Sequence, residues 1–389
     1  MSITAIDKEF VAGTYGRFPV ELVSGKGSIF QGSDGKTYID MGSGIGVTAF
    51  GSADDQWLAA VTAQLNKLQH TSNLYYTEPC ALLAKALCEK TGMKKVFFSN
   101  SGAEANECAI KVARKYSAEK KGADHYTIIT LVNSFHGRTL TTLSATGQEH
   151  FHKLFNPLTP GFVSVEANNV AALTEAVATC KPAGILFEVV QGEGGVLPLT
   201  AEFVAAAARL AKDNDIPLMV DEVQTGNGRT GKLYGYMHFG IQPDIVSTAK
   251  GLGGGLPIGA TLMSEKVQTV LGPGDHGSTY GGNPVCCAGA LSVIARLDEA
   301  FLSEVQAKSD FVFSELNGAP GIESVSGLGL MVGIKTVRPA KEVVMDCMNK
   351  GVLCLTAKDK VRLLPALNIP MDVLKEAIAV IKAACAKEE

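Results

Sequence analysis

The chain has 389 residues, of which 46% are hydrophobic and 19% are charged. This length and apolar content allow a large buried core, so disorder is excluded as the main state and two or three domains are expected. With 35 basic against 39 acidic residues, the chain lacks the positive charge that attracts nucleic acid or an anionic membrane surface, and we expect small-molecule partners, no nucleic acid and no membrane.

The cysteines and the N-terminal segment indicate the cellular compartment. The nine cysteines are odd in number and form no Cys-x-x-Cys pair, which is typical of reduced thiols rather than of disulfides or a zinc site. Residues 1–11 contain charged side chains and no apolar signal-peptide core, and no apolar stretch is long enough to span a membrane. We therefore expect a cytoplasmic protein that holds no metal.

The first two thirds of the chain predict two kinds of β structure. Residues 20–40 alternate polar and apolar side chains around Asp34-Gly35, which predicts short strands joined by a hairpin turn. Between about 96 and 263, apolar runs alternate with amphipathic helical patterns, which predicts a mostly parallel sheet between helices, with its ligand site at the carboxyl ends of the strands. The expected strands are 96–98, 126–131, 162–165, 184–190, 217–220, 245–248 and 259–263, and the expected helices are 105–116 and 201–212.

The pattern changes after about residue 281. The expected elements there are a long helix near 284–317, a strand pair around 321–335, a helix at 341–350 that ends at Gly351, and a C-terminal helix from about 371. The whole chain therefore reads as an α/β protein. Its expected parts are an N-terminal segment of residues 1–56 that joins the small domain, a large domain of residues 57–280, and a small α+β domain of residues 281–389.

A candidate phosphate site lies where the strand 96–98 turns into the following helix. The residues there are Ser101, Gly102 and Ala103, and the N–H groups of a first helical turn point outward without partners. An ordinary serine N-cap is the alternative. No P-loop motif occurs in the chain, so a nucleotide site of that type is not expected.

Two charged residues follow strands of the expected sheet. Asp221 ends the apolar run 217–220 and would face the ligand crevice, where it could pair with a positive ring nitrogen or a metal; a surface position is the alternative. Lys250 follows the strand 245–248 and precedes a Gly-rich turn. A lysine held there away from water has a lowered pKa and a reactive amine, whereas the alternative is a surface lysine in a flexible loop.

Phe135 and Arg138 follow the expected strand 126–131. An aromatic ring can cover a planar cofactor and a guanidinium can hold a carboxylate, although a buried Phe beside a surface Arg is equally common. The stretches 191–195 and 277–284 are weak signals by themselves. Together the motifs supply a phosphate site, a stacking ring, a carboxylate, a reactive lysine and an arginine, which is the set that a pyridoxal-phosphate enzyme requires.

These motifs resemble those of the class III, fold-type I aminotransferases, which depend on pyridoxal 5'-phosphate, and within that family the acetylornithine type. The similar stretches are residues 14–19, 72–76, 100–106, 134–139, 191–196, 221–231, 243–259 and 277–284. The resemblance implies a fold-type I architecture, with a large domain whose mostly parallel seven-stranded sheet lies between helices and a small α+β domain. It also implies a homodimer with shared active sites.

The resemblance implies which residues bind the cofactor. Lys250 forms the Schiff base and moves the proton during catalysis, Asp221 pairs with the pyridine nitrogen, and Gln224 binds the phenolic oxygen. The other implied cofactor-binding residues are Ser101, Gly102 and Ala103 at the phosphate, Phe135 on the ring face, and Thr279 from the neighbouring subunit.

The resemblance also implies the reaction, in which the terminal amine of N2-acetylornithine passes to 2-oxoglutarate. The products are N-acetylglutamate 5-semialdehyde and glutamate, a step of arginine biosynthesis. Arg138 would bind the distal carboxylate and Arg362 the carboxylate near the ring, while Glu193, the third implied catalytic residue beside Lys250 and Asp221, masks Arg362 during the first half-reaction. Ser278 and Tyr15 complete the implied substrate-binding residues.

Other functions remain open at this point. Aminotransferases of ornithine, succinylornithine, succinyl-diaminopimelate or 4-aminobutyrate share the cofactor and most of the motifs. A non-catalytic binding protein of the same fold would be expected to lack Lys250 or Asp221, and both are present. The chain departs from the family pattern at residues 49–55, where a Gly-His-x-His-Pro stretch is usual, and at Val189, where Pro is common. The first departure puts the substrate in doubt more than the chemistry.

Overall fold

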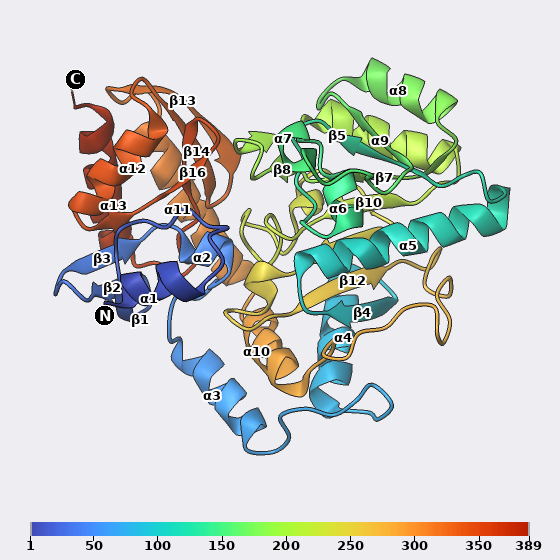
Figure 1. Cartoon of the computed structure of the whole chain (residues 1–389), viewed down its shortest axis with the longest axis horizontal. Coiled ribbons are helices and arrows are strands. Elements are labelled where there is room, and N and C mark those ends of the chain that lie inside the picture. The colour runs from blue at the N-terminus through green and yellow to red at the C-terminus, as the bar shows by residue number, and fades with distance from the viewer. Residues whose placement is uncertain (1, 388–389) are drawn as a thin grey trace.

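The computed structural model describes residues 2–387, and its largest element is a seven-stranded sheet in the order β4-β12-β11-β10-β7-β5-β6 (Figure 1). The strands are β4 (Lys95–Ser99), β5 (Thr127–Leu131), β6 (Phe162–Val165), β7 (Pro182–Phe187), β10 (Leu218–Asp221), β11 (Ile245–Thr248) and β12 (Gly259–Met263). Only β12 runs antiparallel to its neighbours in this sheet, which confirms the expected strands and the mostly parallel sheet.

Helices cover both faces of this sheet. Because side chains alternate along a strand, β7 directs Leu186 toward the apolar face of α5 (Gly102–Lys121) and Phe187 toward α9 (Ala201–Asp213). The helix α8 (Val170–Thr179) packs beside α9. The expected amphipathic helix is confirmed in α5, whose buried face includes Ala105, Cys108, Ala109, Val112, Ala113 and Tyr116.

The two ends of the chain form a second region (Figure 1). One sheet joins β1 (Leu22–Lys26), β2 (Ile29–Gly32) and β3 (Thr37–Asp40) to β15 (Val352–Leu353), and the expected hairpin turn at Asp34-Gly35 is confirmed between β2 and β3. Another sheet has the order β13 (Ile322–Leu328), β14 (Met331–Thr336), β17 (Lys360–Leu363) and β16 (Leu355–Ala357). The helices α12 (Ala340–Asn349) and α13 (Met371–Cys385) pack together beside these sheets, and both were expected.

The single long helix expected near 284–317 is wrong. The structure has two helices there, α10 (Pro284–Ala295) and α11 (Glu299–Leu316). Asp298 starts the second helix, because its side chain accepts a hydrogen bond from the backbone N–H of Phe301 at 2.8 Å. The break separates two packing partners, since α10 packs against α3 (Asp55–Leu65) and α4 (Glu78–Thr91) whereas α11 packs against α13.

The remaining elements are short or lie at the surface. They are α1 (Ile3–Phe10), α2 (Ser43–Gly46), α6 (Leu140–Ala145), α7 (Glu149–His152), β8 (Val190–Gln191), β9 (Leu197–Pro198), and the 3₁₀ turns η1 (Gly235–His238) and η2 (Lys250–Leu252). Within residues 2–387 no helix is long and apolar enough to cross a membrane. The domain boundaries at 56/57 and 280/281 stay a prediction.

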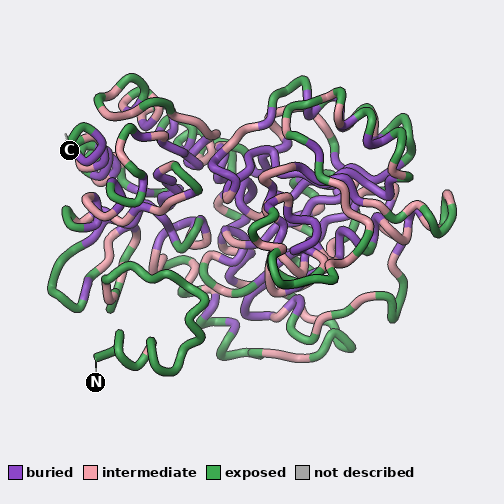
Figure 2. The backbone as a smooth tube through the Cα atoms, turned by 45° about the horizontal axis from the view of Figure 1, so that its top comes forward, coloured by how far each residue is buried: buried purple, intermediate pink, exposed green. Residues whose placement is uncertain are grey.

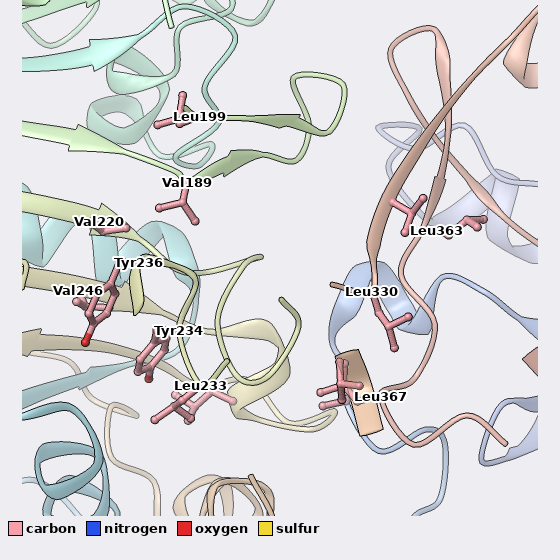
Figure 3. Packing of buried hydrophobic residues seen from close by; sticks show 14 of the residues in the cluster. Val189, Leu199, Val220, Leu233, Tyr234, Tyr236, Val246, Leu330, Leu363 and Leu367 are labelled. Atoms are coloured by element: carbon pink, nitrogen blue, oxygen red, sulfur yellow. The ribbon is translucent and has the colours of Figure 1, made fainter. Parts of the chain in front are cut away.

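Buried residues form a core that continues from the large sheet into the C-terminal region (Figure 2). Figure 3 shows Val189 and Tyr236 beside strands of the large sheet, with Leu330 and Leu367 on the opposite side of this packing. Val189, which replaces the proline common in the family, is fully buried, and its carbonyl accepts a hydrogen bond from Leu199 N–H at 2.9 Å. Packing in the core therefore accounts for a valine at this position.

Candidate active site

A cavity of about 490 Å³ lies beyond the carboxyl ends of β10 and β11 and beside the start of α5. Open α/β sheets bind ligands at this position. The cavity brings together many of the residues predicted from the sequence, namely Ser101, Gly102, Ala103, Phe135, Arg138, Asp221, Gln224 and Lys250.

The start of α5 forms an anion site on the wall of the cavity. Ser101 caps the helix by accepting a hydrogen bond from Glu104 N–H at 3.2 Å, and Glu104 accepts one from Asn100 N–H at 2.8 Å. Among residues 2–387 nothing accepts the N–H groups of Gly102 and Ala103, which belong to the first turn. A Cβ atom on Gly102 would lie 2.7 Å from Val223, so only glycine lets the helix approach this closely.

Asp221 lies at the bottom of the cavity and is 3% exposed. Its Oδ2 accepts hydrogen bonds from Asn106 Nδ2 at 2.7 Å and His136 Nδ1 at 2.8 Å, and its Oδ1 accepts one from Val223 N–H at 3.0 Å. Asn106 is fixed in turn by Ser247 Oγ, 2.6 Å from its Oδ1. Three donors, one of them fixed by Ser247, therefore hold this carboxylate in one orientation.

Lys250 follows β11 and has a backbone φ of 44°, in the left-handed region that a residue with a side chain rarely adopts. Asn227 supports this conformation, because its Nδ2 donates to Thr248 Oγ1 at 2.9 Å and to the carbonyl of Ala249 at 3.2 Å. Burial lowers the pKa of Lys250, against the opposing attraction of Glu193. The amine is thus held in a conformation and an environment suited to a nucleophile.

Phe135 and Arg138, which follow β5, also line the cavity. The backbone N–H of Phe135 donates to Glu188 Oε2 at 2.9 Å. The guanidinium carbon of Arg138 lies 4.1 Å from the centre of the Phe151 ring and 5.5 Å from that of Phe135. In the described part of the chain no carboxylate pairs with Arg138, so its guanidinium is free to bind an acidic ligand.

Glu193, Arg362 and Gln224 form a connected group at the edge of the cavity. Arg362 Nη1 donates to Glu193 Oε1 at 2.6 Å and to Gln224 Oε1 at 3.3 Å, and Gln224 Nε2 donates to Glu193 Oε1 at 3.3 Å. Burial acts to raise the pKa of Glu193, but the charge and hydrogen bond of Arg362 lower it overall. Glu193 lies in the β8–β9 hairpin and Arg362 in β17, so the group joins the two regions of the molecule.

Five predicted residues are absent from the lining of the cavity in the single chain. Two of them, Glu193 and Arg362, are joined to the lining by their hydrogen bonds with Gln224. Tyr15 is 74% exposed and lies near Arg17, Thr279 is exposed, and Ser278 accepts a hydrogen bond from Asn100 Nδ2 at 3.2 Å at the rim. The atypical stretch 49–55 is also absent from the lining, where its neighbour Val47 contributes instead.

Three functional positions were missed in the sequence: Asn106, His136 and Glu188. All are buried and line the cavity. Burial, with the nearby Asp221 charge, raises the pKa of Glu188 well above its ordinary value. The available signals were that His136 follows Phe135 directly and that Asn106 lies near the start of α5, but the contacts of these two residues with Asp221 join parts far apart in the chain.

The residues of the cavity fit pyridoxal phosphate. The cofactor's phosphate requires hydrogen-bond donors, which the N–H groups of Gly102 and Ala103 provide. Its ring nitrogen requires a fixed anion, its flat ring an aromatic face, and its aldehyde an amine with a lowered pKa. Asp221, Phe135 and Lys250 supply these in a single cavity.

Comparisons with known proteins show the family of the chain. Residues 10–385 match the family model of class III aminotransferases. The chain is 50% identical to the acetylornithine aminotransferase of Haemophilus ducreyi over 97% of each chain, and 43% identical to that of Methanocaldococcus jannaschii over 96% of this chain and 94% of the relative.

Solved structures show the same architecture. The ornithine aminotransferase of Toxoplasma gondii superposes with a TM-score of 0.94 at 31% identity, covering 98% of this chain and 94% of the other. The N-acetylornithine aminotransferase of Stenotrophomonas maltophilia has a TM-score of 0.85 at 31% identity, covering 99% and 98%. The chain therefore belongs to the class III aminotransferases, pyridoxal-phosphate-dependent enzymes of fold type I.

Proposed function

We propose that this aminotransferase moves the terminal amine of N2-acetylornithine to 2-oxoglutarate, giving N-acetylglutamate 5-semialdehyde and glutamate in arginine biosynthesis. The observation that carries the proposal is a pair of arginines, Arg138 in the cavity lining and Arg362 bonded to the lining residue Gln224. Among residues 2–387 Arg138 pairs with no carboxylate, whereas Arg362 is paired with Glu193. Relatives named acetylornithine aminotransferase, 40 to 50% identical over nearly the full length, support the choice of amino donor.

The two substrates need different carboxylate contacts. N2-acetylornithine reacts at its terminal amine and carries its carboxylate far from the ring, where Arg138 would bind it. Glutamate and 2-oxoglutarate carry one distal carboxylate and one beside the reacting carbon, and the second would bind Arg362 after Glu193 moves away. A bidentate arginine contact provides both the affinity and the orientation that this requires.

Bound pyridoxal phosphate supplies an electron sink that makes the substrate C–H bond acidic and carries the amino group between half-reactions. Lys250 would hold the cofactor through its amine and, once released, move the proton at the substrate carbon as general base. Asp221 would keep the ring nitrogen protonated because its carboxylate is buried and fixed by Asn106 and His136. Gln224 is assigned to the phenolic oxygen.

The other cofactor contacts follow from the cavity wall. The phosphate would bind the N–H groups of Gly102 and Ala103, with Ser101 beside it, and the ring would stack on Phe135. The flat cofactor would then lie between the start of α5 and the ends of β10 and β11, which line the same cavity.

A homodimer with shared sites accounts for the residues outside the cavity. Leu74, Tyr75, Tyr76 and Tyr280 are large apolar side chains that a single chain leaves exposed. Asn73 Nδ2 donates to the carbonyls of Ser278 and Gly281, at 3.0 and 2.9 Å, which ties this apolar surface to the segment that carries Thr279. On a partner's surface, Thr279 would reach the phosphate of the other cofactor and Ser278 the substrate. The proposed location is the cytoplasm.

The test is a comparison of amino donors with 2-oxoglutarate as the common acceptor. N2-acetylornithine, N2-succinylornithine, succinyl-diaminopimelate, ornithine and 4-aminobutyrate are each assayed by glutamate formation. We expect the highest kcat/KM with N2-acetylornithine. A higher value with ornithine, the substrate in the name of the Toxoplasma gondii neighbour, would replace the proposed donor and leave the chemistry unchanged.

A further inference from the structure

Arg229 is a buried cation that the proposed chemistry does not use. It is 3% exposed, and within residues 2–387 no carboxylate lies within salt-bridge distance of it. Its Nη1 donates instead to two backbone carbonyls, those of Leu330 at 3.0 Å and Pro365 at 2.6 Å. Burying a guanidinium with only neutral partners is costly, so the contacts it makes need an explanation.

Both carbonyls belong to the C-terminal region, whereas Arg229 belongs to the loop that follows β10. Leu330 lies in the turn between β13 and β14, and its N–H donates back to the carbonyl of Arg229 at 3.0 Å. The backbones meet closely here, because a Cβ atom on Gly329 would lie 2.4 Å from Thr230. Figure 3 shows Leu330 and Leu367 on this side of the core. Arg229 therefore fastens the large-sheet region to the C-terminal region.

In the sequence, the contacts of Arg229 lie close to the group formed by Glu193, Arg362 and Gln224. Arg229 is in the same loop as Gln224, and Pro365 follows Arg362 at the end of β17. The backbone of Arg362 has no freedom of its own, since β17 pairs with β14 on one side and β16 on the other. Leu330 and Pro365 lie at the same end of the paired strands β14 and β17, so Arg229 holds this strand pair, and with it Arg362, against the loop that carries Gln224.

We propose that Arg229 is a positioning residue that sets where Arg362 stands relative to Gln224 and Glu193, and so determines how well the enzyme binds the carboxylate beside the reacting carbon of 2-oxoglutarate. This inference rests on the proposed assignment of Arg362 to that carboxylate. The charge of the buried Asp40 carboxylate opposes the lowering of the Arg229 pKa by burial, although the two side chains form no salt bridge within residues 2–387.

The test compares Arg229→Met and Arg229→Lys with a matched control, Lys308→Met. Lys308 is another buried cation that donates to a carbonyl of the same C-terminal segment, Leu367 O at 2.9 Å, but within residues 2–387 it forms no hydrogen bond with the loop after β10. Each holoenzyme is titrated with glutarate, a dicarboxylate that cannot react, by the change in cofactor absorbance. Steady-state KM and kcat are measured for 2-oxoglutarate, and single-turnover rates for the amino donor.

We expect Arg229→Met to weaken glutarate binding and raise the KM for 2-oxoglutarate by at least about tenfold, with the amino-donor half-reaction within about threefold of wild type. The effects of Arg229→Lys on glutarate binding and on KM should lie between those of wild type and of Arg229→Met. This variant provides the test if Arg229→Met does not fold. Wild-type glutarate binding in the Arg229 variants, equal losses in both half-reactions, or the same pattern in Lys308→Met would overturn the proposal. If the wild type prefers another amino donor, the proposal of N2-acetylornithine as substrate is wrong. The Arg229 variants are then compared with wild type using that donor.

Discussion

Two carboxylates near the cavity are held in opposite ways. Asp221 accepts three hydrogen bonds, from Asn106, His136 and Val223, all within the large-sheet region, and is almost completely buried. Glu193 interacts with Gln224 and with Arg362, which belongs to the other region, and its side chain is 29% exposed. The first carboxylate is fixed away from solvent, whereas the second is partly exposed, as the proposed displacement of Glu193 from Arg362 requires.

The difference matches the two tasks of the proposed reaction. The cofactor is the same in both half-reactions, so its ring needs a carboxylate that never moves. The substrates differ in where they carry a carboxylate, so the arginine that distinguishes them needs a mask that can be displaced. A substitution of Asp221 should therefore affect both half-reactions, and a substitution at Glu193 or Arg362 mainly one of them.

The largest effect is expected from Lys250→Ala, which removes the amine on which both half-reactions depend. Turnover should be abolished, while the cofactor still binds through the separate anion site at Gly102 and Ala103. Visible absorbance and borohydride trapping of the purified protein provide the measurement. Normal turnover in the variant, or a wild type that stays colourless with pyridoxal phosphate, would contradict the account.

Asp221→Asn should slow both half-reactions alike, by roughly 10²- to 10³-fold or about 3 to 4 kcal/mol in activation free energy, because a neutral amide would not keep the ring nitrogen protonated. Single-turnover rates of each half-reaction provide the measurement. Asp244→Asn is the matched control, since Asp244 accepts a hydrogen bond from Leu218 N–H at the opposite end of β10. A loss confined to one half-reaction would show that Asp221 acts on a substrate rather than on the cofactor.

Arg362→Ala should damage the glutamate half-reaction by on the order of 2 to 4 kcal/mol and the N2-acetylornithine half-reaction much less. The reason is that only glutamate places a carboxylate beside the ring. Arg338→Ala is the control, because Arg338 pairs with Asp346 at 2.8 Å in the same region but away from the cavity. Equal losses in the two half-reactions would count against the assignment of Arg362.

Shared sites are tested by mixing Lys250→Ala chains with Thr279→Ala chains. A mixed dimer places both defects in one site and leaves the other intact, so an equal mixture should regain about a quarter of wild-type activity. The measurement is activity after subunit exchange, with exchange shown independently and each parent assayed alone. An active monomer in sedimentation, or no recovery under demonstrated exchange, would exclude the shared site.

The smallest effect concerns the stability of the cofactor-free protein. The folded state lowers the pKa of Lys250, so its protonated form destabilises the fold at neutral pH, and this cost disappears as pH rises toward the ordinary lysine value. Lys250→Met should therefore raise the free energy of unfolding at pH 7, with a smaller gain at pH 9.5, measured by urea unfolding. Lys335→Met is the control, because Asp359 raises the pKa of Lys335, and it should show no such gain.

Much of the fold could be predicted because its signals are local. Each strand of the large sheet is a short apolar run, and Asp221 and Lys250 could be placed at the cavity because both directly follow such a run. The break at Asp298 was missed because apolar residues continue on both sides of it, although aspartate is itself a start signal for a helix.

The unpredicted features depend on contacts between distant residues. His136 and Asn106 meet Asp221 across 85 and 115 positions of the chain, and no local pattern marks either pairing. The parallel pairing of β15 with β3 likewise joins the two ends of the chain. The resemblance to a known family supplied roles for Arg362 and Glu193 that spacing alone would not have suggested.

The most direct test of the movable mask is the Glu193→Gln variant, which keeps the shape of the side chain and removes its charge. Single-turnover rates are measured as a function of concentration for glutamate and for N2-acetylornithine. With Arg362 unmasked, the ratio of glutamate to N2-acetylornithine kcat/KM should rise by at least about tenfold, because Arg362 then attracts the carboxylate of N2-acetylornithine into the wrong position. An unchanged ratio in a folded variant that binds the cofactor normally would contradict the account.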